Sequence, residues 1–452
     1  MTCLSPASAI SAAPFAFPSS RPGPAEKAFA LLVLAGLFNA AILDVLVGQL
    51  PRPDIVAMLD VEDHARWMAS EANAGISLVF WPAAYLVSGL LFLRDALRWS
   101  VLRAGGTVLA LCAVLLLSTV WSDAPRDTAM RAIHITGKSL FALWLVRRMG
   151  LRGTFGLLVF AGSAVLLAGW ALALARPEVG WQAYRGETAL RGFFTHKSAY
   201  GMAAMFTAFL GCALLVSGGV PDLKRAHLAM LSLVALASLS VSQSVTAVLM
   251  LALALLVFAA GRRVARGSSA RQRRRRLFES AVFLALVIGS AWLVQSVILE
   301  AFGRDATLSR RTAIWDAILA SQGAGNLLGH GYYGFWRYEP GSPLFEIVGR
   351  EGFAASSPHN AFLLAWLDTG WLGLALFAGV ILTAVLSAVR LLLRGGDGLQ
   401  AMPLALAIVI ATTGFVESNL FTGQEINWIL LVIALAGSKL ALRPSRICRK
   451  QS

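Results

Sequence analysis

The amino-acid sequence predicts an all-α polytopic membrane protein with about 12 transmembrane helices. Hydrophobic residues make up 57% of the 452 positions and charged residues only 14%, and the mean hydropathy is +0.69. The chain also divides into long apolar stretches, and a helix needs about 20 apolar residues to cross a bilayer. A soluble multidomain protein of this length is therefore excluded.

Twelve apolar stretches approach that length, and polar connections separate most of them. They lie at 27–49, 73–93, 102–120, 130–149, 152–175, 196–217, 228–243, 244–260, 277–299, 365–390, 401–417 and 425–443. The seventh and eighth stretches are short and nearly contiguous. No internal repeat of fixed period is visible, which disfavours a transporter built from inverted repeats.

The apolar stretches divide the chain into five parts. These are a disordered cytoplasmic leader (1–26), nine membrane helices (27–299), a large external loop with an amphipathic helix (300–364), three further membrane helices (365–443) and a basic cytoplasmic tail (444–452). The large loop thus separates the ninth membrane helix from the tenth.

Lys and Arg residues set the predicted orientation, because cytoplasmic connections of membrane proteins are rich in both. With twelve spans, the basic connections all fall on one side, which is predicted to be cytoplasmic together with both termini. The net charge of +15 then reflects loops that face anionic lipid, and nucleic acid is not expected as a partner. The basic positions are Arg94, Arg98, Arg147, Arg148, Arg152, Lys224, Arg225, the run 262–276, Arg390, Arg394 and the tail.

The long external loop is too polar to span a membrane. Its part 312–321 has a helical apolar pattern, with Ile314, Trp315, Ile318 and Leu319 on one face. We expect an amphipathic helix there, followed by a glycine-rich turn and a mobile loop.

The stretch SPHNAFLLAWLDTGWLG, residues 357–373, places two polar residues directly before an apolar run. Ser357 and Pro358 suit the N-cap and first position of a helix, so the helix is expected to begin there. His359 and Asn360 would then lie at the positive end of a helix dipole, where anions bind. The alternative is that His359 is an interfacial residue without a chemical role.

Two further basic groups are predicted on the external side. Arg191, His196 and Lys197 precede the sixth apolar stretch, and Arg310 and Arg311 head the amphipathic helix. Positive charge is depleted on this side of membrane proteins, so an anionic partner is expected. One arginine side chain can bind two phosphate oxygens at once. A neutral histidine can accept a proton from a hydroxyl. The alternatives are surface arginines in ion pairs and a hydrogen-bonded interfacial histidine.

Four motifs in order, THKSAYG, SRRTAIW, GHGYYGFW and SPHNAFLLAWLDTGWLGLALF, carry a family resemblance. The chain resembles the O-antigen ligase and Wzy-type polymerase superfamily over about residues 180–440. The THK motif makes it most similar to the ExoQ-like exopolysaccharide polymerases. The earlier spans match only in hydropathy and number.

The resemblance implies an enzyme of the bacterial inner membrane with GT-C-like architecture, acting on undecaprenyl-diphosphate-linked glycans at the periplasmic face. It implies no metal, nucleotide or other cofactor. By motif, the family's arginine and tryptophan correspond to Arg311 and Trp315. The family's arginine before the sixth span corresponds to Arg191. His359 matches the histidine that activates the acceptor hydroxyl. Arg310, Lys197 and His196 are assigned with the two arginines to the diphosphate, and Asn360 and Trp315 support the site.

The chain departs from the ExoQ-like pattern at one position and matches it at another. Ser198 stands where asparagine usually follows the HK pair, while SQSVTA, with Gln243, resembles the branch's Q-S-x-T element and makes Gln243 a site-supporting residue. The alternative for SQSVTA is polar packing between helices. The implied partners are a lipid-linked oligosaccharide donor, a glycan or lipid A core acceptor, membrane lipid and polysaccharide export proteins.

Two alternatives remain open beside a polymerase. A ligase would use lipid A core as acceptor, and a transporter would place ionisable residues such as Asp44 and Lys138 near the membrane midplane. Asp60, Glu62 and Asp63 could bind a divalent ion, although a solvated acidic loop is the favoured interpretation.

Overall fold

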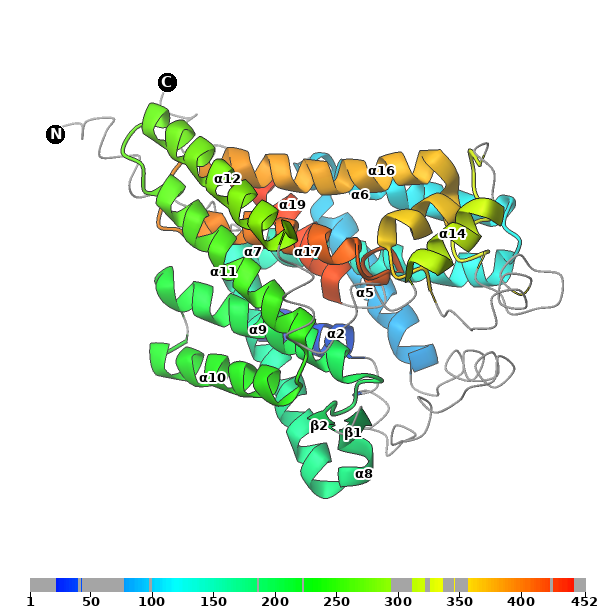
Figure 1. Cartoon of the computed structure of the whole chain (residues 1–452), viewed down its shortest axis with the longest axis horizontal. Helices are drawn as coiled ribbons and strands as arrows, with labels where there is room; N and C mark the ends of the chain where they lie inside the picture. The colour runs from blue at the N-terminus through cyan, green and yellow to red at the C-terminus, as the bar shows by residue number, and fades with distance from the viewer. Residues whose placement is uncertain are drawn as a thin grey trace.

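The computed structural model shows a helical membrane protein (Figure 1). It describes residues 22–39, 42, 77–96, 100–184, 187–221, 223–293, 311–321, 326–335, 345, 357–422 and 426–442. Within these residues, 5 helices are long and apolar enough to cross a membrane, and shorter apolar helices accompany them. The chain is therefore a multi-pass membrane protein.

Figure 1 labels the helices and strands. They are α2 (Pro24–Phe38), α5 (Ser77–Ala96), α6 (Ser100–Leu117), η2 (Ser118–Val120), α7 (Pro125–Ala175), α8 (Pro177–Gly180), β1 (Trp181–Tyr184), β2 (Glu187–Leu190), α9 (Lys197–Val216), α10 (Arg225–Val241), α11 (Val245–Ala265), α12 (Ala270–Leu293), α14 (Arg311–Ser321), α16 (Ala361–Leu392), η4 (Leu399–Ala401), α17 (Met402–Gly414), α18 (Asn419–Thr422) and α19 (Ile426–Ala441).

Helix occupies part of each of the twelve predicted stretches. Twelve complete crossings stay a prediction, because parts of these stretches, such as 43–49, lie outside the described residues. The predicted tail at 444–452 and the predicted leader up to residue 21 also lie outside them, and α2 already begins at Pro24.

Helix α7 contains two of the predicted stretches, and it breaks at Gly150, where φ is 68° and ψ is 170°. Only glycine adopts such a conformation without strain. Basic residues flank the break and tie it to other parts of the chain. Arg148 pairs with Glu26 of α2 at 2.7 Å, and Arg152 pairs with Asp397 between α16 and α17 at 2.6 Å. These two ion pairs join α7, at its break, to α2 and to the connection between α16 and α17.

Helix α19 lies at the centre of the bundle against α7, α16 and α17. Its residues from Ile426 to Ser438 are buried on every side, as expected for a helix that is apolar all round. The indole Nε1 of Trp428 donates a hydrogen bond of 2.8 Å to Ser139 Oγ on α7. This bond fixes α19 against α7 inside the apolar core.

Helix α16 also breaks, at Gly370, where φ is 62°. The break frees backbone groups that need new partners. A glycine-rich segment, Asn326–Phe335, supplies them: His330 N donates to Leu367 O at 3.0 Å, and Trp371 N donates to Asn326 O at 3.3 Å. The glycine-rich segment therefore fills the break and holds the two halves of α16 in place.

The other side of the glycine-rich segment is attached to η2 and the start of α7. Tyr332 N donates to Ser118 Oγ at 3.1 Å, and Thr128 Oγ1 donates to Tyr332 O at 2.7 Å. The Arg131 guanidinium lies 3.8 Å from the centre of the Tyr333 ring, within the range of a cation–π contact. The expected glycine-rich turn is thus a packed element.

A short β-hairpin accompanies the helices and was not predicted. Strands β1 and β2 pair antiparallel, with Trp181 opposite Leu190. Gln243, in the turn between α10 and α11, donates from Nε2 to Thr188 O of β2 at 3.3 Å. The strands are too short for an alternation of apolar and polar residues to be recognised beside the neighbouring apolar stretches. The fold also determines which strand each one pairs with.

The amphipathic helix predicted at 312–321 is present as α14. Ile314 and Ile318 are buried in a cluster with Phe335 and residues of α16, and Trp315 packs against this cluster. Leu319 differs from the prediction, because 54% of its surface is exposed. The mobile loop expected after the glycine-rich turn falls on 336–356, and almost all of it lies outside the described residues.

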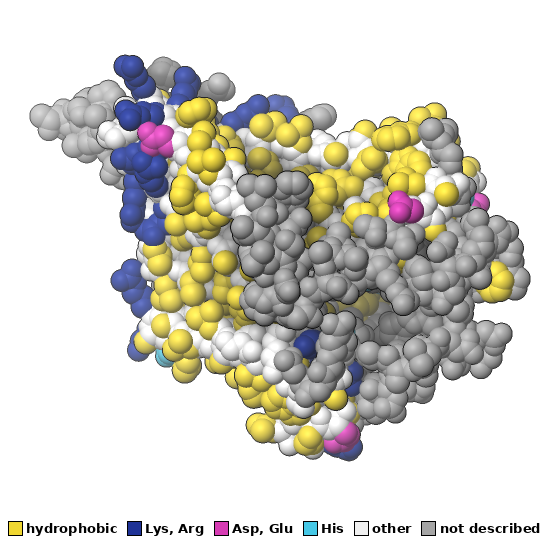
Figure 2. All heavy atoms as spheres, viewed as in Figure 1, with side chains coloured by type: hydrophobic (Ala, Val, Ile, Leu, Met, Phe, Trp, Pro, Cys, Tyr) yellow, Lys and Arg dark blue, Asp and Glu magenta, His cyan; other side chains and the backbone are white. Residues whose placement is uncertain are grey.

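Lys and Arg side chains line one edge of the molecule. Figure 2 shows them along the left edge, over the ends of α10, α11 and α12, while the described surface beside them is mainly hydrophobic. Arg263 and Arg275 there are 58% and 80% exposed and pair with Glu279. This arrangement agrees with a basic cytoplasmic edge, and the assignment of sides stays a prediction from charge.

Gly370→Ala tests the break in α16. A Cβ at this position would lie 2.1 Å from Leu327 O, and a positive φ costs a non-glycine residue about 1–3 kcal/mol. We expect a clearly lower thermal midpoint for the purified variant in detergent. Gly379→Ala is the control on the same helix, because its Cβ would meet no atom within 4 Å. Equal midpoints for both variants would contradict this account of the break.

Candidate functional site

His359 lies in a turn before α16 and is not part of the helix. The helix begins at Ala361 with Asn360 as N-cap, whose Oδ1 accepts from Phe362 N at 2.9 Å and Leu363 N at 3.0 Å. The predicted start at Ser357 and Pro358 was wrong. Ser357 Oγ instead accepts from His359 N at 3.3 Å, and Asn360, an N-cap residue as suitable as serine, takes two helix N–H groups.

The backbone of His359 has a φ of 48°, which is uncommon for a residue with a side chain. Such conformations persist where surrounding contacts enforce them, and they cluster at functional sites. One of these contacts comes from α14, because Trp315 Nε1 donates to Pro358 O at 2.7 Å. The supporting roles predicted for Asn360 and Trp315 therefore have a geometric basis at this turn.

Arg311 is the first residue of α14. The hydrogen bond of Trp315, four residues later, brings this helix against the turn that carries His359. The side chain of Arg311 and all of Arg310 lie outside the described residues, so their binding roles stay predictions.

Glu417 is a site residue that the sequence analysis missed. Its Oε2 lies 3.4 Å from His359 Nδ1, and 37% of the Glu417 side chain and 35% of the His359 side chain are exposed. The next residue, Ser418, accepts from Asn360 N through Oγ at 3.1 Å. The one available signal was a carboxylate at the external end of the predicted stretch 401–417.

The start of α9 carries a second group of polar residues. His196 is the N-cap, and its Nδ1 accepts from Ser198 N at 3.1 Å. Lys197 is 5% exposed, and its backbone N donates to Gln182 Oε1 of β1 at 2.8 Å. Gln182 was also missed, because its link to α9 depends on the hairpin. With Nδ1 used as an acceptor, neutral His196 carries its proton on Nε2.

Burial and the charge of Lys197 hold the pKa of His196 below its ordinary value of 6.5. Glu417 opposes this shift through its negative charge, and Arg191 adds to it. Glu417 thus acts on His196 as well as touching His359. The structure therefore relates the starts of α9 and α16 through one carboxylate.

Arg191 follows β2 and is 7% exposed. Its Nε donates to Val179 O at 2.8 Å, so part of the guanidinium holds the chain around the hairpin. Gln243 has a different place, because it is exposed and bonds to Thr188 O. The supporting role assigned to Gln243 stays a prediction, and its hydrogen bond is to the hairpin, which also carries Gln182.

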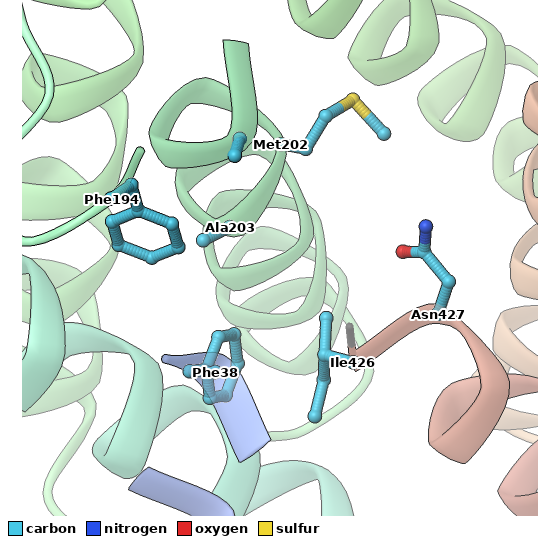
Figure 3. Close-up of a pocket in the computed structure, with 7 residues that line it drawn as sticks. Phe38, Phe194, Met202, Ala203, Ile426 and Asn427 are labelled. Carbon is cyan, nitrogen blue, oxygen red and sulfur yellow. The ribbon is translucent and has the colours of Figure 1, made fainter. Parts of the chain in front are cut away.

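A narrow pocket opens beside the start of α9 (Figure 3). Its lining comes from α2, the turn before α9, α9 itself and α19, and Figure 3 shows the Asn427 amide extending from α19 toward Met202. Asn427 Oδ1 is buried and has no hydrogen-bond partner among the residues that the structure describes. The lining residues are Phe38, Phe194, Ala199, Met202, Ala203, Ile426 and Asn427.

The motif D-x-G-x-x-G after His359 has a structural role. Asp368 is fully buried, Gly370 forms the break in α16, and a Cβ at Gly373 would overlap Thr369. Asp44, Asp60, Glu62 and Asp63 lie outside the described residues. Among the residues that the structure does describe, no three His, Cys, Asp or Glu side chains are placed to hold a metal ion.

The arrangement can perform two chemical tasks. Cationic groups at the start of α9 suit an anion, and His359 beside a carboxylate suits proton transfer. Residues 227–378 match the family model described as O-Antigen ligase. The match covers less than half of the chain and shows what this segment is similar to. It includes α14 and His359, whereas Arg191, His196 and Glu417 lie outside the O-antigen ligase match.

The chain is also similar to the exopolysaccharide production protein ExoQ of Rhizobium meliloti (strain 1021). The two are 26% identical over 323 residues, which cover 70% of this chain and 72% of that protein. The resemblance seen in the sequence motifs is thereby confirmed.

The depressed pKa of His196 predicts a pH-dependent stability. The unfolded chain binds a proton at His196 more readily than the folded chain, so stability is greatest above pH 6.5 and falls as the pH drops below it. His196→Asn retains an N-cap but cannot titrate. We expect a weaker fall of the thermal midpoint between pH 8 and pH 5 in this variant.

His227→Asn is the control for loss of a histidine, because His227 is exposed on α10. The same pH slope in the wild type and in His196→Asn would show that His196 does not contribute.

Proposed function

We propose that the chain is a glycosyltransferase that moves an undecaprenyl-diphosphate-linked glycan to an acceptor hydroxyl at the periplasmic face. The observation that carries this proposal is the turn of His359, which is held by Trp315 of α14 and lies 3.4 Å from Glu417. A histidine in this setting can accept a proton, and the basic groups predicted beside it suit a diphosphate. The reaction would take place in the bacterial inner membrane.

In the proposed reaction, the acceptor hydroxyl gives its proton to His359 as its oxygen bonds to the anomeric carbon. The bond from that carbon to the diphosphate oxygen breaks, and the diphosphate leaves with the electron pair. Arg191, Arg311 and Lys197 stabilise the negative charge of the leaving group. Neutral His196 contributes an N–H donor from Nε2. Arg310 is assigned to the same diphosphate.

A polymerase is the preferred form of this activity. The similarity to a protein named for exopolysaccharide production extends over 70% of the chain, whereas the O-antigen ligase match covers residues 227–378. The acceptor would then be a second lipid-linked glycan. The family description supports the alternative, a ligase that transfers the glycan to lipid A core.

Two substitutions test the reaction in protein reconstituted with a defined lipid-linked donor and acceptor. His359→Ala removes the base and is expected to lower kcat about 100- to 10,000-fold. Arg311→Ala removes a diphosphate contact and should also abolish most product. His227→Ala, an exposed change on α10, is the control. Normal polymer length or ligation in both site variants would contradict the proposal.

The same reconstitution separates the competing classes. A covalent product in a mixture containing only donor glycans indicates a polymerase, and a product that requires lipid A core indicates a ligase. Movement of the donor across the vesicle membrane without a covalent product would identify a transporter instead.

A further inference from the structure

Glu417 occupies a fixed position between two helices of the site. The turn after α17 is closed by a hydrogen bond of 2.8 Å from Glu417 N to Thr413 O. Phe415 in this turn stacks on Phe362 of α16, with ring centres 4.5 Å apart. These contacts place the Glu417 backbone against the first turn of α16.

A second attachment lies directly beside the carboxylate. Asn360 N, one residue after His359, donates to Ser418 Oγ, one residue after Glu417, at 3.1 Å. The two side chains therefore project from backbone segments that are hydrogen-bonded to each other. The 3.4 Å between Oε2 and Nδ1 exceeds the roughly 2.8 Å of a charge-assisted hydrogen bond. A small side-chain movement closes this difference, because both groups are partly exposed.

We propose that Glu417 positions His359 for catalysis by accepting the Nδ1–H and leaving Nε2 as the atom that takes the acceptor's proton. A neutral imidazole carries one proton, and the partner of one nitrogen decides which nitrogen holds it. The carboxylate also stabilises the imidazolium that forms when Nε2 becomes protonated. This inference rests on the proposed glycosyl transfer and adds a residue to it.

The charged groups around Glu417 distinguish a role in proton transfer from a role in binding the diphosphate. His359 faces it from the start of α16, and His196 faces it from the start of α9, next to Lys197 and Arg191. A negative charge in this group opposes the binding of an anionic diphosphate. The negative charge of Glu417 therefore assists proton transfer and does not raise the affinity for the donor.

Glu417→Gln removes the charge and nearly preserves the shape. We expect kcat to fall about 10- to 100-fold, the loss typical of residues that orient another group. The KM for the lipid-linked donor should stay equal or fall, since the site becomes more positive. Glu417→Asp should recover part of kcat.

Two matched controls accompany this variant. Ser418→Ala removes the hydrogen bond to Asn360 without changing charge, and its kcat should fall less than that of Glu417→Gln. Glu178→Gln removes an exposed carboxylate of α8, 57% exposed, and should leave kcat unchanged. Adding Glu417→Gln to His359→Ala should cause no further loss, because Glu417 acts through His359.

Failure of the two proposals can be told apart. If the wild type transfers glycan and His359→Ala does not, a wild-type kcat in Glu417→Gln would overturn the role of Glu417 alone. A raised KM with unchanged kcat would also overturn it, because Glu417 would then serve binding. If the wild type forms no covalent product with either acceptor, the glycosyltransferase proposal fails, and the role of Glu417 fails with it.

Discussion

The arrangement of the site depends on backbone hydrogen bonding at the break of α16. A helix inside an apolar environment cannot leave its N–H and C=O groups without partners. At Gly370 the glycine-rich segment Asn326–Phe335 provides them, and the same segment is bound to η2 and α7. The first half of α16, which begins after His359, is thereby set in a fixed direction relative to the core.

The polar residues at the site are held mainly by backbone contacts. Asn360 caps α16, Trp315 binds the carbonyl of Pro358, and His196 caps α9. Each contact satisfies a backbone group that a helix end or turn leaves open. The candidate site residues therefore lie at or beside helix starts, where the positive end of the helix dipole favours anions. Glu417 supplies the opposing charge, so the site combines groups suited to anion binding and to proton transfer.

Features that depend on local sequence patterns were predicted correctly, whereas features that depend on tertiary contacts were not. The amphipathic helix α14 and the turn between α10 and α11 were predicted because apolar periodicity and stretch length are local properties. The helix start at Ser357 was wrong, because two acceptable N-caps lie three residues apart and tertiary contacts select between them. Leu319 faces outward because the packed stripe of α14 is narrower than its apolar pattern. The hairpin and Gln182 were missed, since strand pairing depends on the surrounding fold.

The sequence by itself determined that the chain is a multi-pass membrane protein, that helices occupy its apolar stretches and which motifs resemble the O-antigen ligase family. Lengths of apolar runs and motif spacing are properties of single segments, so they can be recognised without a fold. Only the tertiary structure decided that Glu417 meets His359, that the glycine-rich segment fills the break at Gly370 and that Gln243 supports a hairpin. These contacts join residues far apart in the chain, and packing of whole helices sets their geometry.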